Sequence, residues 1–423
     1  MASGRLRLQR PAAAVTADRD VFGILRNRDF RRILAAEVVS DVGNFVTFVA
    51  LAVRVHDITG TTLAVGFAFA LRAVPWFTLG PVAGVFVDRA DRRVVMVVSD
   101  LARAALVTVL AFTNSVGQLY LIAFLSGCFG PFFRPARHAL LPVVAPGDQY
   151  VKALAVAEIA HQSLHTVGPA MGGLAVALVG ARRAFLLDAV TFLVSAALVV
   201  GVRVRGAVGT RPTSVAEVGR DLAEGARTVW RDRILRSLFA ARCMWILGEA
   251  GVLALLVSYI RDDLGRSGSA YGFALAVGGA GTAIVAFVLA KLGPRTRRVR
   301  WMAVGVVSQA LFVGVAFRPG FAALLGIMAA EGAIIGGWAL YDDVITAEHV
   351  PDAMRGRVFA LSGSTGQLAD FVGSLGLAAL GEAIGVSAGI AISGALASVL
   401  GLALLAPALA ALRAEDAARH ALS

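Results

Sequence analysis

The chain has 423 residues, of which 58% are apolar and 16% charged, and its mean hydropathy is +0.76. Soluble domains are about 45–50% apolar and about 25% charged, so this composition excludes a soluble enzyme, a coiled coil and a disordered scaffold. The formal charge of +12 suggests a nucleic-acid partner. The basic residues, however, lie almost entirely in the breaks between apolar runs of about 20 residues, each long enough to cross a bilayer. We therefore expect membrane lipid, and no nucleic acid, around this chain.

Hydropathy predicts an all-α membrane protein with twelve spans. They cover residues 31–54, 61–87, 92–113, 117–142, 150–179, 183–202, 234–260, 268–291, 299–317, 320–346, 354–383 and 386–411. The tails 1–30 and 412–423 are predicted to be cytoplasmic, because the first of them lacks the apolar core of a signal peptide. In the longest break, 203–233, valines and leucines recur at helical spacing, which predicts a cytoplasmic linker with an amphipathic helix.

The basic residues also predict the orientation in the membrane. Of the 40, 31 fall in one set of alternate breaks, the set that begins with the N-terminal tail. Cytoplasmic loops carry the excess of Lys and Arg in membrane proteins, so both termini are predicted to be cytoplasmic. An even number of spans agrees with this.

The two halves of the sequence resemble one another. A shift of 205 positions pairs Pro146 with Pro351, together with an Arg-Arg pair and a Gln in each half. Such a repeat predicts two parallel six-helix bundles, residues 31–202 and 234–411. Bundles of this kind form secondary transporters whose substrate site lies between the two repeats.

A charged motif follows the second predicted span. It consists of Gly84, Asp88, Arg89, Arg92 and Arg93, and it matches the pattern G-x-x-x-D-R-x-x-R-R. With this motif the sequence resembles the major facilitator superfamily, in which the cluster gates the cytoplasmic side. Asp88 would then face the start of the eleventh span, where a helix N-terminus favours an acid. The alternative is a loop whose positive charge only directs topology.

A second motif lies in the fifth predicted span. Gly168, Pro169, Gly172 and Gly173 match the pattern G-P-x-x-G-G of the superfamily's antiporters, whereas the glycine expected further upstream is Leu164. The resemblance extends to the exporter branch that includes macrolide and enterobactin efflux proteins. It implies alternating access, with the prolyl bend letting the repeats rock. A simple packing motif is the alternative.

Charged residues within the spans are costly, at about 2.5–3.5 kcal/mol each on insertion scales, and so are candidates for function. Glu37 and Asp41 lie one turn apart on one helical face and close to the predicted midplane. Two adjacent carboxylates in a low-dielectric site favour binding of a proton, which we expect to compete with substrate. Arg72 and Arg103, at similar depth, would be the counter-charges. A static buried salt bridge that specifies packing is the alternative.

His161 and Glu331 reach a comparable depth from their own span ends. His161 shares a face with Glu158 and His165, a spacing that also occurs in metal-binding helices. A metal site would need ligands from other helices, and a cavity-lining or proton-relay role fits better. Neither a metal nor another cofactor is therefore expected. Asp188, near the end of the sixth span, is predicted to pair with an arginine at that end.

The sequence lacks the motifs of several other classes. It contains no G-x-x-x-x-G-K-[ST], no H-E-x-x-H and no G-x-S-x-G, which argues against an ATP-driven pump and an enzyme. We expect a monomeric, proton-coupled exporter of a drug, antibiotic or siderophore-like molecule in a bacterial plasma membrane. A nutrient importer or facilitator, or a non-transporting receptor or scaffold, is the alternative.

Overall fold

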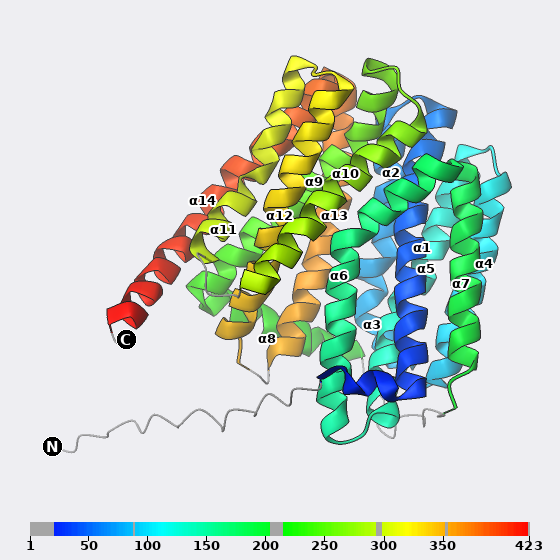
Figure 1. Cartoon of the computed structure of the whole chain (residues 1–423), viewed down its shortest axis with the longest axis vertical. Coiled ribbons are helices and arrows are strands. Elements are labelled where there is room, and N and C mark those ends of the chain that lie inside the picture. The colour runs from blue at the N-terminus through cyan, green and yellow to red at the C-terminus, as the bar shows by residue number, and fades with distance from the viewer. Residues whose placement is uncertain (1–20, 88, 204–214, 293–297, 352–353, 422–423) are drawn as a thin grey trace.

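The computed structural model describes residues 21–87, 89–203, 215–292, 298–351 and 354–421. Every regular element in these residues is a helix, and the long helices pack side by side (Figure 1). The predicted all-α fold is confirmed. Nine helices in the described part are long and apolar enough to cross a membrane, and shorter apolar helices accompany them.

The first half of the chain forms six crossings. A short 3-10 helix, η1 (Val21–Arg26), precedes α1 (Arg28–Thr59), α2 (Thr62–Thr78), α3 (Gly80–Val87), α4 (Arg92–Phe112), α5 (Val116–Val144), α6 (Asp148–Val179) and α7 (Ala181–Val200). The second predicted span is thus two helices, broken at Leu79. The break follows from Pro81, which has no N–H to continue the helical hydrogen bonds.

The second half repeats this arrangement after a linker helix. It contains α8 (Val215–Arg231), α9 (Arg233–Ser258), the π-helical turn η2 (Tyr259–Asp263), α10 (Gly268–Leu292), α11 (Arg298–Val306), the 3-10 helix η3 (Ser308–Phe317), α12 (Phe321–His349), α13 (Arg355–Ile384) and α14 (Val386–Ala421). Since α9 continues into η2 and α11 into η3, this half also supplies six crossings.

Polar residues at the helix starts determine where the spans begin. Asn27 Oδ1 accepts hydrogen bonds from the backbone N–H groups of Asp29 and Phe30, at 3.0 and 3.1 Å. Asp91 caps α4 in the same way, and Asp232 caps α9. Each cap satisfies N–H groups that have no partner within their helix.

The two six-helix bundles meet where α2 packs on α13 and α6 packs on α10. Glycines allow this close approach. A Cβ on Gly66 would lie 2.2 Å from the carbonyl oxygen of Ser374, and one on Gly173 would lie 2.1 Å from that of Gly272. No side chain larger than hydrogen fits at either position, as is common where helices approach closely in membranes.

Polar contacts between the bundles lie at the end opposite the start of α1, which is called the distal end below (Figure 1, top). Arg261 Nη2 and Asp57 Oδ1 are 2.6 Å apart, and His56 Nε2 and Asp262 Oδ1 are 3.1 Å apart. Further hydrogen bonds there join Thr62 N to Glu382 Oε2 at 3.0 Å and Thr62 Oγ1 to Ser258 Oγ at 3.0 Å. The two bundles are therefore held together at the distal end.

Candidate functional site

The middle of the first bundle contains a carboxylate–imidazole pair. Asp41 Oδ2 on α1 lies 3.3 Å from His161 Nδ1 on α6, and Asn44 Nδ2 donates to Asp41 Oδ1 at 3.5 Å. The Asp41 side chain is 27% exposed and that of His161 is 9% exposed. The sequence placed both residues at the same depth, and the structure brings them together. Such a pair can hold a proton between its two groups while one member remains accessible.

Glu37 lies beside this pair but has a partner of its own. Arg137 Nη1 on α5 and Glu37 Oε2 are 2.5 Å apart, with side-chain exposures of 0% and 2%. Arg137 was not among the predicted site residues. The signal was present, because Arg137 falls within the predicted span 117–142, although it also belongs to the basic residues at the cytoplasmic end of that span.

The same region satisfies the distance criterion for a metal site. One ligand atom each from Glu37, Asp41 and His161 lies within 4.8 Å of the others. The guanidinium of Arg137 on Glu37 already neutralises one of the two carboxylates, so the cluster suits a proton better than a divalent cation. The other residues considered for a metal site, whose side chains lie outside the described part of the structure, are Glu158 and His165.

Arg103 is buried in a separate network of the first bundle. Its Nη2 lies 2.5 Å from Asp100 Oδ1, one turn earlier on α4, and donates to Ser40 Oγ on α1 at 3.3 Å. Ser195 Oγ on α7 donates to the second oxygen of Asp100 at 2.5 Å. A direct ion-pair partner of Arg103 is therefore Asp100, and the role of Arg103 as a counter-charge of Asp41 stays a prediction. The i, i+3 spacing of Asp100 and Arg103 was the signal that could have revealed this pair.

Arg72 lies at the boundary between the bundles. Its guanidinium carbon is 5.3 Å from the centre of the Phe48 ring. The acids that act on it electrostatically are Asp370, on α13 of the other bundle, and Asp188 on α7. Arg72 is therefore placed to respond when α13 moves relative to α2.

The prediction for Asp188 is wrong. Asp188 is fully buried, and Thr191 Oγ1 donates to its Oδ1 at 3.0 Å. It packs against Gly43 of α1, where a Cβ would come within 1.9 Å of the same oxygen. Among the described residues Asp188 forms no ion pair, and Arg182 and Arg183 instead line a cavity at the distal end. Its position one to two turns into α7 moves it away from these arginines.

The second bundle contains a buried acid, Glu331, and a half-buried acid, Glu249, of a different kind. Ser308 Oγ donates to Glu331 Oε1 at 3.4 Å, and Gln309 Nε2 donates to Glu249 Oε2 at 3.2 Å. The two carboxyls act on one another electrostatically. In the described part of the chain neither forms an ion pair with a basic residue. A buried carboxyl with only neutral partners is more stable when it carries a proton.

The loop motif between α3 and α4 is only partly described. Asp88 and the surroundings of Gly84 lie outside the described residues, so the expected contact of Asp88 with the eleventh span stays a prediction. Arg93 Nη2 donates to the carbonyl oxygen of the last residue of α7 at 2.7 Å. Arg92 is half-buried next to it, and Arg89 is exposed.

The glycine motif in α6 has two faces. A Cβ on Gly172 would lie 2.4 Å from the carbonyl oxygen of Phe45 on α1, and one on Gly168 would overlap the Phe45 ring. Gly173 faces the other way and packs on Gly272 of α10. The motif therefore joins α6 to its own bundle on one side and to the opposite bundle on the other.

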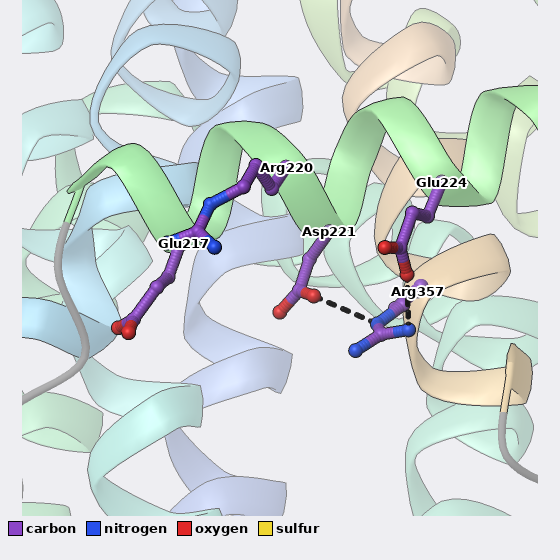
Figure 2. A pocket seen from close by; sticks show the side chains of 5 residues that line it. All are labelled: Glu217, Arg220, Asp221, Glu224 and Arg357. Atoms are coloured by element: carbon purple, nitrogen blue, oxygen red, sulfur yellow. Dashed lines mark hydrogen bonds and ion pairs between the residues drawn. The ribbon is translucent and has the colours of Figure 1, made fainter.

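The linker helix α8 is attached to the second bundle at the end where α1 begins. Arg357, near the start of α13, pairs with two acids of α8 (Figure 2). Its Nε lies 2.8 Å from Asp221 Oδ1 and its Nη1 lies 2.5 Å from Glu224 Oε2. The backbone of Gly225 approaches that of Arg357. The segment predicted as an amphipathic linker helix is thus docked onto α13.

The sequence that forms this arrangement matches a known protein family. The family model of the Major Facilitator Superfamily matches residues 33–374. The chain belongs to the Major Facilitator Superfamily. It is accordingly a multi-pass membrane transporter and not an enzyme.

Relatives of this transporter include two efflux proteins. Macrolide efflux protein A of Streptococcus pyogenes is 22% identical over 396 residues, which are 92% of this chain and 97% of the relative. The multidrug efflux pump Tap of Mycolicibacterium fortuitum is 28% identical over 375 residues, 84% of this chain and 90% of the relative. The crystal structure of a mutant of the nucleoside transporter NupG has a TM-score of 0.72 at 11% identity, and the match covers 90% of this chain and 99% of that one. This last likeness concerns the fold alone.

Proposed function

We propose that this transporter exports a small molecule from a bacterial cell across the plasma membrane, in exchange for protons. The observation that carries the proposal is the Asp41–His161 pair, at 3.3 Å and partly accessible in the middle of the first bundle. A carboxylate that can either pair with a protonated imidazole or bind substrate couples the two events, because each excludes the other.

The orientation follows from the distribution of charge. Of the 40 basic residues, 31 lie in the breaks on the side of the termini, which we assign to the cytoplasm. The distal end then faces outside. The contacts between the bundles at that end, such as Arg261 with Asp57 at 2.6 Å, support a state closed to the outside.

In this cycle the neighbouring charges have separate roles. Arg137 stays on Glu37 and prevents that acid from competing for the proton. A proton taken up on His161 from the outside strengthens its pairing with Asp41 and releases substrate. Loss of that proton to the cytoplasm frees Asp41 for the next substrate molecule. Arg72 interacts electrostatically with Asp370 of the other bundle, so a change in the charge of the site would alter the attraction between Arg72 and α13.

The substrate class is proposed from the relatives. Two efflux proteins that align with at least 84% of this chain are named for macrolides and for multiple drugs. We therefore infer a bulky, largely apolar substrate such as a drug, antibiotic or siderophore-like molecule. The match of Gly168, Pro169, Gly172 and Gly173 to the pattern of the superfamily's antiporters supports export.

The test is accumulation of a labelled macrolide and of a cationic dye in cells that express the transporter, with and without a proton uncoupler. We expect lower accumulation than in cells without the transporter, and loss of this difference with the uncoupler or in Asp41→Asn. Asp263→Asn removes an exposed carboxylate of the distal end and is the matched control. Export that survives the uncoupler would contradict proton coupling. Higher accumulation would instead identify an importer.

A further inference from the structure

A cavity separate from the Asp41–His161 pair lies at the distal end. Its volume is about 390 Å³. The walls come from the last turn of α1, the turn between α6 and α7, and the first turn of α10. Two of these walls belong to the first bundle and one to the second, so the cavity exists in this form only while the distal end is closed.

The cavity is strongly basic. Arg54, Arg182 and Arg183 line it together with a single acid, Asp57, whose carboxylate is already paired with Arg261 at 2.6 Å. The rule that places basic residues on the cytoplasmic side leaves few of them at the distal end. The six found there are Arg54, Arg182, Arg183, Arg261, Arg266 and Arg318. Half of these line one cavity, which topology does not explain.

The guanidinium of Arg54 is fixed by hydrogen bonds from one of its nitrogen atoms. Its side chain is 9% exposed, and its Nη2 donates to the carbonyl oxygen of Thr113 at 3.2 Å and to Asn114 Oδ1 at 3.1 Å. Its Nε is buried and has no hydrogen-bond partner in the described part of the structure. The same holds for the Nε of three other arginines in that part of the chain, so it is the positive charge of Arg54 at the cavity wall, and not this atom, that favours an anion there.

Two helix N-termini add to the positive potential. The 20-residue helix α7 starts at Ala181 after Gly180, which has a positive φ of 79° and no side chain to cap the first N–H groups. The 25-residue helix α10 starts at Gly268 on the opposite wall. Uncapped N–H groups and the helix dipole both favour an anion at such ends.

We propose that this cavity binds a phosphate-type oxyanion, either free or as the headgroup of an anionic lipid. Arg54 and Arg183 supply charge-assisted hydrogen bonds from the first bundle, and the start of α10 closes the site from the second. Gly268 already packs tightly on Val53 there, because a Cβ on it would lie 2.4 Å from Val53 Cγ1. A bound anion therefore bridges the bundles and favours the state with the distal end closed.

The first experiment measures thermal unfolding of the purified full-length transporter in detergent. Sodium phosphate is titrated against sodium chloride at equal ionic strength. We expect phosphate to raise the Tm of the wild type, and Arg183→Gln, which changes an exposed residue, to weaken the apparent affinity about tenfold. Arg54→Gln should weaken it at least as much. Arg318→Gln removes an exposed distal arginine outside the cavity and should leave it unchanged.

The second experiment measures closure directly. Ser258 is buried between the bundles at the distal end. In a Cys128→Ser, Cys243→Ser background, a maleimide labels Ser258→Cys only after that end opens. Phosphate at about ten times its Kd should slow labelling about tenfold, and this effect should be lost with Arg183→Gln. Parallel titrations with phosphatidylglycerol, read by the same labelling rate, distinguish a lipid headgroup from a free phosphate as the bound anion.

The outcomes divide clearly. A response to inorganic phosphate that depends on Arg183 assigns a soluble anion, and a response to phosphatidylglycerol alone that depends on Arg183 assigns a lipid headgroup. Both support the site. The proposal is overturned if neither probe raises the Tm. It is also overturned if Arg183→Gln responds to the probes as the wild type and the control Arg318→Gln do.

Discussion

The two bundles share one architecture, but one buried glutamate of the first bundle and one of the second are stabilised differently. In the first bundle Glu37 is paired with Arg137 at 2.5 Å, and both side chains are almost fully buried. In the second bundle Glu331, equally buried, accepts a hydrogen bond from the hydroxyl of Ser308 at 3.4 Å and has no basic partner in the part of the chain that the structure describes.

This difference distinguishes a carboxylate with a fixed charge, Glu37, from a carboxyl that can exchange a proton, Glu331. A buried ion pair is strongly destabilised when one partner is removed, because the other is left charged in a medium of low dielectric constant. A protonated carboxyl bonded to neutral groups can be replaced by an amide at small cost. Glu37 and Arg137 thus form a buried pair of fixed charges, whereas Glu331, whose hydrogen-bond partner in the described residues is a neutral hydroxyl, is more stable when it carries a proton.

The largest expected effect tests the fixed pair. Arg137→Gln should destabilise the transporter by about 3–5 kcal/mol, since it leaves Glu37 buried and charged without a counter-ion. Unfolding titrations in mixed detergent micelles measure this. In the variant Arg137→Gln with Glu37→Gln, part of the stability should return. A single-variant loss under about 1 kcal/mol would show that the pair contributes no fixed charge.

The next effect concerns the boundary between the bundles. Gly173→Leu should cost about 1–3 kcal/mol, because the new side chain meets the carbonyl oxygen of Gly272. It should also leave the distal end open and abolish transport. Gly376→Leu is the control, since a Cβ there meets nothing within 4 Å. Equal transport by both variants would contradict the tight closure inferred for α6 and α10.

A smaller effect on stability is expected in the second bundle. Glu331→Gln keeps an acceptor for Ser308 and removes only a proton-binding group, so unfolding should change by about 1 kcal/mol or less. Glu37→Gln, made alongside, should cost more because it leaves Arg137 unpaired. If the two substitutions cost the same, the distinction between fixed charge and exchangeable proton fails.

The smallest effect is expected at the linker helix. Arg357 and its partners on α8, Asp221 and Glu224, are partly exposed, and such pairs contribute about 0–1 kcal/mol. Arg357→Gln should therefore lower stability slightly at low salt and not at high salt. An equal loss at both salt concentrations would mean that packing of α8, and not charge, holds the linker.

The sequence predicted the fold well because spans are determined by composition and length. All twelve predicted spans correspond to helices, and the deviations have local causes. Pro81 divides the second span into α2 and α3, and η2 extends α9 by a π-helical turn. The first of these boundaries cannot be read from hydropathy, since the chain around Pro81 stays apolar, whereas the π-helical turn contains Arg261, Asp262 and Asp263 and so extends past the predicted span 234–260.

The candidate site was only partly predictable. Depth along each helix, at 1.5 Å per residue, placed Asp41 and His161 at one level. It could not show which residues face each other, because the rotation of a helix that is apolar all round leaves no periodic signal. For this reason the contact between Arg137 on α5 and Glu37 on α1 was missed, whereas Asp100 and Arg103 lie on one helix and their i, i+3 spacing could have been read from the sequence.

The central claim is that Asp41 exchanges a proton for substrate, and the most direct measurement follows protons in proteoliposomes that contain the purified transporter. A substrate gradient is imposed and the internal pH is read with a trapped dye. The account predicts substrate-driven proton movement in the wild type and in Asp263→Asn, and at least a tenfold loss, about 1.4 kcal/mol of coupling, in Asp41→Asn. Undiminished proton movement in Asp41→Asn would contradict it.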